Sequence, residues 1–572
     1  MLRLARKGVF EGMKPANSRR EFLKLLGLSG LGMASGCCVT AQSIPASVGG
    51  LSAGLLAQDP SAQMAASMGI PAIDAHAHFF NASDMQAAGY LSGPVANDAP
   101  AAIRALIDIL HPVVNSMARS FAPSAYQESV YLETMNSGLA GLSATDRLDR
   151  LDQSIIRRKD QIAVELYRRL QRTDFPAAFQ SSMLDGRFLI QGQTRFSEDT
   201  VRTALDYGLE QDALFNSTAT FEGPAGEHPA GLLAFIGNMF HYRVENIRIY
   251  QKAYTGQNRA VRVKAACMAM VDFDYWLDGC DHPPSRLRDQ VLLMEMLVKV
   301  TDGYVLPLMA YNPWTDLKSG GESLALLEEA VSDRGFVGVK VYPPVCFEPF
   351  GNGSSAVKKD WPSADRLEPV LERFYKKCLD LDIPVMAHAN FSMGAEPVCK
   401  DRSSPGNWKS LLETPGFERL RINLGHFGGN HGPSSTGHSW SDGFVRLMTK
   451  APHLYADIGF WDELAAGKPA VVNKLMGLMH SDIGSGQQAA QRIMFGTDWF
   501  MLGQKKNWPV YADHVYQQLE SAGAGSAEIE QLLYRNVLDL YGLTRTTPGQ
   551  NRQRLNDYYT DKGISADWFS LT

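Results

Sequence analysis

Pro71-Ala72-Ile73-Asp74-Ala75-His76-Ala77-His78 (residues 71–78) is a short apolar strand that ends in polar side chains. Alternate residues of a strand point to the same face, so His76 and His78 would present two imidazoles together at the strand end. Neutral imidazole is a ligand for zinc, iron and similar cations. An HxH pair alone is a weak sign of a metal site, because two unrelated polar residues at a strand end give the same pattern.

Strand-like segments recur through the rest of the chain, and helical patterns separate most of them. Short buried strands that alternate with helices are typical of parallel βα units, and eight such units close a TIM barrel. We therefore predict an α/β fold, a (β/α)8 barrel over residues 71–545 that includes the strand at Ile73. The later strands are expected at 263–271, 304–310, 335–342, 383–388, 422–426, 454–458 and 493–498.

Residues 83–255 interrupt this alternation with long helical patterns. Leu148, Leu151, Ile162 and Leu166 recur at the spacing of one helix face. We predict a large helical insertion between the first and second strands, far longer than the usual βα loop of about 2–6 residues. The sequence leaves open whether the insertion caps the barrel, restricts substrate size or forms an oligomer interface. Residues 546–572 form a polar, aromatic-bearing tail with no predicted place.

The N-terminal 41 residues resemble a twin-arginine export signal, because Arg19-Arg20 precedes a modest apolar run. That resemblance implies the twin-arginine export machinery as a partner and a periplasmic or secreted protein. Lipid anchoring at Cys37 is the less favoured alternative. Residues 42–70 are rich in Ala, Ser and Gly and are expected to be a flexible leader. The apolar run falls short of the about 20 residues that a stable membrane span needs.

The remaining composition is that of an ordinary globular protein, with 45% hydrophobic residues and a net charge of −6. This balance gives no general attraction to nucleic acid or to an anionic membrane. Seven cysteines form no CxxC pair, which argues against a structural zinc ribbon. One disulfide among the last five cysteines is compatible with the sequence, which does not choose the pair.

Three further polar residues each close their own apolar strand: His388, His426 and Asp498. In parallel barrels the C-terminal strand ends meet at one mouth, where active sites lie. These three side chains should therefore converge with His76 and His78. Such a set is hard to explain as separate structural residues, because burying unpaired polar groups together is unfavourable.

At these motifs the chain resembles the amidohydrolase superfamily, in its amidohydrolase-related (amidohydrolase 2) branch. The resemblance spans roughly residues 70–545 outside the insertion, and a strand and a closing helix also match, at 338–344 and 536–543. Its most specific parts are Asp74-x-His76-x-His78, His388, His426 and Gly496-Thr497-Asp498-Trp499.

The resemblance implies one divalent metal, held by His76, His78, His388 and Asp498. Zinc is the first expectation, with manganese and iron as alternatives. His426 would orient the water or polarise the substrate, and Asp498 would also take the proton of the attacking water.

Lys340, on the predicted fourth strand, has two interpretations. Some superfamily members carry a carboxylated lysine in this region that bridges two metals. Otherwise Lys340 binds a substrate carboxylate or pairs with an acidic side chain. His431 and His438, in the glycine-rich segment after His426, are weaker candidates for substrate contacts. The segment 272–276 follows the second strand and is also expected to face the mouth.

Three functions are compatible with this pattern. The first is a hydrolase that uses a metal-activated water on a C–N, ester or lactone bond of a small substrate. The second is a non-oxidative decarboxylase of an aromatic or muconate-type acid at the same site. The third is a barrel that binds a metal or ligand without catalysis, which the intact set of polar strand ends disfavours. The sequence leaves a homo-oligomer open.

Overall fold

The structure is a computed structural model, and part of the chain lies outside what it describes. The predicted signal with Cys37, as well as His431 and His438, fall outside the described residues. The structure describes residues 43–44, 51–57, 69–96, 99, 101–184, 195–209, 211–221, 229–256, 258–274, 276–277, 285–357, 361–392, 394–429 and 439–571.

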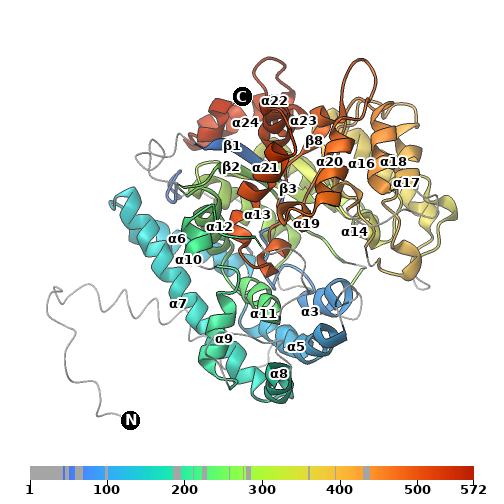
Figure 1. Ribbon diagram of the computed structural model, residues 1–572. Helices are drawn as coiled ribbons and strands as arrows, with labels where there is room; N and C mark the ends of the chain where they lie inside the picture. The colour runs from blue at the N-terminus through green and yellow to red at the C-terminus, as the bar shows by residue number, and fades with distance from the viewer. Residues whose placement is uncertain are drawn as a thin grey trace, which may run out of the picture. The chain divides into compact units, whose positions relative to one another are not determined.

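Eight parallel strands form one sheet in the order of the sequence, which confirms the predicted α/β fold. The sheet closes into a barrel, because the Ala75 N–H donates to the Phe495 carbonyl at 3.0 Å and the Asp498 N–H donates to the His76 carbonyl at 2.7 Å. Figure 1 shows the strands at the centre of the helices. They are β1 (Ile70–Ala77), β2 (Val261–Ala269), β3 (Val305–Ala310), β4 (Gly338–Val341), β5 (Val385–His388), β6 (Ile422–Gly425), β7 (Leu454–Asp457) and β8 (Ile493–Met494).

From β3 on, the strands are shorter than the apolar runs that predict them. The last run was expected to reach Asp498, whereas β8 ends at Met494. Asp498 has φ 53°, in the left-handed region that non-glycine residues rarely adopt, so the chain turns there. This turn aims the segment after β8 across the end of β1, where Ala77 pairs with Trp499.

The helices between and after the later strands pack their apolar faces on the barrel. In α16, for example, Val370, Leu371, Phe374 and Cys378 are buried at helical spacing. These helices are α13 (Leu287–Val300), α14 (Pro313–Ser319), α15 (Glu322–Asp333), α16 (Glu368–Asp380), α17 (Pro405–Leu412), α18 (Trp440–Met448), α19 (Asp462–Ala465), α20 (Pro469–Met479), α21 (Tyr511–Ser521), α22 (Ser526–Glu530) and α23 (Asn536–Leu540). Short 3-10 and π turns are η2 (Pro343–Val345), η3 (Asn352–Ser354), η4 (Ala364–Leu367), η5 (Pro397–Cys399), η6 (His426–Gly428), η7 (Ala489–Arg492), η8 (Met501–Gln504), η9 (Trp508–Val510) and η10 (Gln531–Arg535).

Helices also fill the segment between β1 and β2. In the longest of them, α7, Leu148, Leu151, Ile162 and Leu166 are buried on one face, as their spacing indicated. Helix α11 packs on α9 and on η8, the turn that follows Asp498. The elements are α3 (Ala87–Tyr90), η1 (Leu91–Val95), α5 (Ala101–Ser120), α6 (Ala125–Leu139), α7 (Ala144–Leu170), α8 (Phe175–Leu184), α9 (Glu198–Leu205), α10 (Gln211–Phe215), α11 (Pro229–Asn238) and α12 (Arg243–Tyr254).

A buried ion network joins parts of this insertion. Arg243, 1% exposed, donates from Nε to Glu128 at 3.0 Å and from Nη2 to Asp84 at 2.8 Å. Burial raises the pKa of Glu128 to about 7, although Arg243 opposes that shift. The Ser83 and Ser285 hydroxyls share a hydrogen bond of 2.8 Å, which links the network to the segment before α13. The ion network therefore holds parts of the insertion together, and the Ser83–Ser285 hydrogen bond ties it to the segment between β2 and α13.

The expected flexible leader is partly packed, which corrects the prediction for residues 51–57. Leu51, Leu55 and Leu56 are all at most 4% exposed. The Gly54 and Leu56 N–H groups donate to carbonyls at the end of α13, at 2.9 and 2.8 Å. Composition misled here, because a few leucines among small polar residues are enough to bury a short segment.

The C-terminal tail contains α24 (Gln550–Lys562) and η11 (Asp567–Leu571). The Trp568 Nε1–H donates to the Gly303 carbonyl at 2.8 Å, just before β3. The Asn551 side chain donates to the Val337 carbonyl at 2.7 Å, just before β4. The tail therefore covers N-terminal strand ends, away from the mouth.

A disulfide joins Cys346 and Cys399, with their Cα atoms 4.8 Å apart. These residues follow β4 and β5, so the bridge ties two loops at the mouth of the barrel. Cys267 and Cys378 are buried free thiols. No helix among the described residues is both long and apolar enough to cross a membrane.

Candidate metal centre

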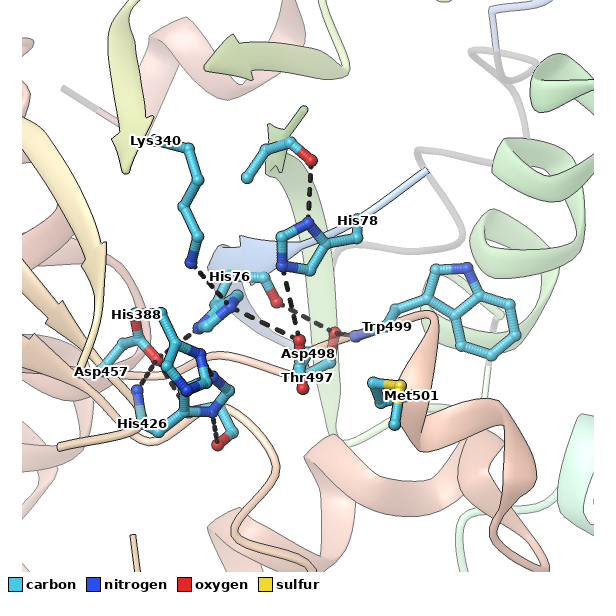
Figure 2. Close-up of polar contacts among 12 residues, drawn as sticks. His76, His78, Lys340, His388, His426, Asp457, Thr497, Asp498, Trp499 and Met501 are labelled. Carbon is cyan, nitrogen blue, oxygen red and sulfur yellow. Dashed lines mark hydrogen bonds and ion pairs between the residues drawn. The ribbon is translucent and has the colours of Figure 1, made fainter. Parts of the chain in front are cut away.

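Three predicted ligands meet where β1 closes on the segment after β8. His76, His78 and Asp498 each offer one ligand atom, and these atoms lie within 4.8 Å of one another. The Asp498 Oδ1 atom lies 3.4 Å from His76 Nε2 and 3.6 Å from His78 Nε2 (Figure 2). His76 is fully buried, whereas His78 and Asp498 keep 7% and 6% exposure, so the group is reached from their side.

The hydrogen bonds of the two histidines leave their Nε2 lone pairs available. His78 Nδ1 lies 2.9 Å from the Ala269 carbonyl, which only accepts, so Nδ1 carries the proton. His76 Nδ1 donates in the same way to the Asp457 carboxylate at 2.8 Å. Burial, reinforced by Lys340, holds the pKa of both histidines well below its usual value, which keeps the rings neutral.

This donor set fits a divalent transition metal. It offers two neutral imidazole nitrogens and one carboxylate oxygen, a combination suited to zinc, iron or manganese. The carboxylate that fixes the second nitrogen of His76 is also the usual support of a metal-binding histidine. His76, His78 and Asp498 are thus the residues that would hold the ion, and the donor set leaves its identity open.

Asp457, at the end of β7, was not predicted and organises the centre. Its Oδ1 accepts from His76 Nδ1 and from the backbone N–H groups of His426, at 3.1 Å, and Gly459, at 2.9 Å. Its Oδ2 accepts from the Asn423 side chain at 2.8 Å. A signal was present in the sequence, since Asp457 is the single charge in an apolar strand. It was missed because the apolar Ile458 follows it, so the strand was predicted to end one residue later.

Asp74 is a structural anchor of the motif rather than a ligand. Its carboxylate accepts from the His76 N–H at 2.9 Å, from the Thr497 hydroxyl at 2.5 Å and from the Tyr250 hydroxyl at 2.5 Å. Burial raises its pKa to about 6 against these hydrogen bonds. Asp74 thereby fastens β1 to the segment after β8 and to α12 of the insertion.

Two glycines let neighbouring backbone approach the buried ring of His76. A Cβ atom on Gly459 would lie 2.7 Å from His76 Nδ1, and one on Gly496 would lie 2.8 Å from His76 Cβ. Neither separation is tolerated by real side chains. The glycine of the Gly496-Thr497-Asp498 motif is therefore required by packing against His76.

His388 and His426 form a second pair beside the three candidate ligands. His426 Nδ1 lies 3.0 Å from the Gly459 carbonyl and must carry the proton there. With both rings neutral, His426 Nε2 accepts from His388 Nδ1 at 3.1 Å. His388 Nε2 is left with a lone pair, buried and without a partner among the described residues. His388 lies outside the three-residue group, and burial holds its pKa well below its usual value.

Lys340, at the end of β4, points at the same centre. It is 2% exposed, and its Nζ lies 3.5 Å from His76 Nε2. Burial lowers its pKa to about 8, while Asp457 and Asp498 act in the opposite direction. A metal on His76 Nε2 would displace this hydrogen bond, so Lys340 would turn to another partner.

The structure thus brings together six of the predicted site residues. His76, His78, Lys340, His388, His426 and Asp498 all belong to one connected cluster (Figure 2). His426 and Asp498 both have positive φ, 67° and 53°, and such strain is common at functional sites.

Solved structures with some likeness to the chain include three proteins, each 12% identical to it. One is described as a 2-pyrone-4,6-dicarboxylic acid hydrolase from Acinetobacter baumannii; the match covers 53% of this chain and 90% of that one, with a TM-score of 0.32. Another is described as a metal-dependent hydrolase from Lactobacillus casei, with 84% and 96% covered and a TM-score of 0.35. The third is 5-carboxyvanillate decarboxylase from Sphingomonas paucimobilis, with 49% and 79% covered and a TM-score of 0.31.

Among curated proteins, none matches this sequence. A family model described as Amidohydrolase (Amidohydro_2) matches residues 240–543. The match begins beyond most of the insertion, so it omits β1 with His76 and His78, which the closure of the barrel places beside Asp498. It covers more than half of the 572 residues, and the protein therefore belongs to the amidohydrolase family.

Proposed function

We propose that the protein is a metal-dependent hydrolase acting on a C–N, ester or lactone bond of a small substrate. The observation that carries this proposal is the convergence of two imidazole lone pairs and a carboxylate at the barrel mouth. The chemistry supplied by a bound divalent cation is the acidification of a water molecule and the polarisation of a carbonyl.

Asp498 is the proton carrier of this proposal. Its carboxylate lies beside both histidine ligands and keeps 6% exposure, so a water and a substrate can reach it. Burial raises its pKa well above the usual value, which favours a carboxylate that takes a proton from water and passes it to the leaving group. His426 is fixed by Gly459 and presents His388, whose free Nε2 serves as a further ligand or as a substrate contact.

A second candidate is a non-oxidative decarboxylase, which Lys340 favours. This ammonium is buried beside the centre and forms no ion pair with a carboxylate among the described residues. A substrate carboxylate bound next to the ligands would satisfy it. The amidohydrolase family accommodates either reaction, and the site residues are the same for both.

Turnover assays separate these candidates. The metal-loaded chain would be supplied with lactones, esters, amides and aromatic acids, and both acid release and CO₂ release would be followed. Hydrolysis that stops on chelation and returns with metal supports the first proposal. CO₂ release from an acid, without hydrolysis of any member, would favour the decarboxylase. Turnover that survives complete metal removal would contradict both.

We also propose that the chain is exported by a twin-arginine route to the periplasm or beyond. The Arg19-Arg20 motif motivates this proposal, and the disulfide between Cys346 and Cys399 supports it, because such bonds persist in oxidising compartments. Cell fractionation of the wild type and of an Arg19→Lys/Arg20→Lys variant tests it. Retention of the variant in the cytoplasm is expected, whereas unchanged localisation would contradict the proposal.

A further inference from the structure

The helical insertion reaches the metal centre through Tyr90, the last residue of α3. The Tyr90 hydroxyl donates to the sulfur of Met501 at 3.2 Å. Met501 opens η8, three residues after the ligand Asp498. Tyr90 keeps 8% exposure, and burial, together with the Asp498 carboxylate as a smaller cause, raises the pKa of its phenol. Tyr90 therefore lies at the edge of the centre, although it belongs to the insertion.

A row of rings connects Tyr90 with the histidines of the centre. Tyr90 is parallel to Phe273, with ring centroids 5.7 Å apart and an angle of 3°. Phe273 meets Tyr342 edge-on at 5.0 Å. Tyr342 in turn stacks on His388 at 4.4 Å. Three different parts of the chain, α3 and the segments after β2 and β4, thus build one aromatic surface beside the centre.

Trp276 completes this surface and carries an unpaired polar atom. Its ring lies 5.1 Å from both Phe273 and Tyr342. The side chain is 4% exposed, and its indole N–H finds no acceptor in the part of the chain that the structure describes. Across Tyr342, His388 Nε2 is also buried and unpaired among the described residues. A bound ligand is one way to satisfy such buried polar atoms.

We propose that Tyr90, Phe273, Trp276 and Tyr342 form the substrate-binding wall of the metal centre. A flat, conjugated part of the substrate packs against these rings, and the Trp276 Nε1–H donates to a substrate oxygen. This assignment rests on the proposed function and deepens it. It gives the insertion a direct part in substrate recognition, since Tyr90 comes from outside the barrel.

The test measures binding of two acids of similar size to the metal-loaded full chain. Isothermal titration would compare benzoate, which is planar, with cyclohexanecarboxylate, which is not. The wild type should bind benzoate about fivefold more tightly, the scale of one aromatic contact. Tyr90→Leu should reduce this preference below about twofold with unchanged metal content. Tyr516→Leu, on the outer helix α21 (Tyr511–Ser521), is the matched control and should keep it.

A second variant separates the ring from the hydrogen bond. Trp276→Phe keeps an aromatic ring and loses the N–H, so both acids should bind about tenfold more weakly with their ratio preserved. If Tyr90→Leu fails to take up metal, Phe273→Leu carries the same test of the preference. The proposed substrate-binding wall would be contradicted if the metal-loaded wild type bound both acids equally. It would also be contradicted if Tyr90→Leu and Phe273→Leu kept the preference for benzoate. A wild type that takes up no metal would instead contradict the proposed function.

Discussion

The two sides of the barrel mouth differ in how their histidine side chains are paired. On the β1–β8 side, the second nitrogens of His76 and His78 are bound to Asp457 and to the Ala269 carbonyl. On the β4–β5 side, His388 Nε2 is buried and unpaired among the described residues, and Lys340 lies over the Tyr342 ring and contacts the His76 lone pair that a metal would take. The β1–β8 side therefore has the oriented histidines that a bound metal ion needs. The β4–β5 side has polar groups that a bound substrate would pair with.

Removing the disulfide should have the largest effect on stability. The bridge between Cys346 and Cys399 closes a loop of 53 residues on the substrate side. Loop-closure entropy predicts that Cys346→Ser/Cys399→Ser lowers the free energy of unfolding by about 4 kcal/mol. Urea unfolding under non-reducing conditions measures this, with Cys378→Ser, a buried free thiol, as the control. Equal stability of the double variant and the wild type would show that no bridge forms.

Asp457→Asn should weaken the metal side without abolishing it. An amide still fits beside His76, but it lacks the charge that fixes the ring. Loss of such a support typically costs about 10–100-fold in metal affinity. Competition with a chelating indicator gives the affinity, and Asp462→Asn, a carboxylate that pairs with Lys505 away from the ligands, is the control. An unchanged affinity would show that Asp457 does not orient His76.

Lys340→Met should affect the substrate side alone. Removing the ammonium takes away a partner for a substrate carboxylate, so KM for an acidic substrate should rise about tenfold. Metal content should stay the same, because Lys340 is not among the three grouped ligands. Metal content and KM, measured on the same preparations, distinguish a substrate-binding Lys340 from a Lys340 that bridges two metals. A fall from two metal equivalents to one would instead make Lys340 a bridging ligand.

The smallest expected effect is a pH dependence of stability that arises in the buried ion network of the insertion. The pKa of Glu128 is raised from 4.5 to about 7, so the folded carboxyl stays protonated where the unfolded one ionises. The free energy of unfolding contributed by Glu128 therefore falls as pH rises from about 4.5 to about 7. Glu128→Gln should remove this slope in metal-free protein, whereas exposed Glu372→Gln should not. If the free energy of unfolding had the same pH dependence in the wild type and in Glu128→Gln, the raised pKa of Glu128 would be contradicted.

The sequence predicted the barrel and the grouping of His76, His78 and Asp498, because both follow from local patterns. His388 and Asp498 each end an apolar run, and closure of the barrel brings the C-terminal ends of such strands together. The support by Asp457 was missed, because Ile458 extends its run by one residue. The contact of Tyr90 with Met501 joins residues 411 positions apart and depends on how α3 packs, which no local pattern encodes.

The central claim is that His76, His78 and Asp498 hold a catalytic metal, and elemental analysis tests it most directly. Purified full chain, loaded with zinc, manganese or iron and then dialysed, would be compared with His76→Ala and with His480→Ala, an exposed histidine paired with Glu528. We predict about one equivalent of metal in the wild type and in His480→Ala, and almost none in folded His76→Ala. Equal metal content in all three proteins, or none in the wild type, would contradict the account.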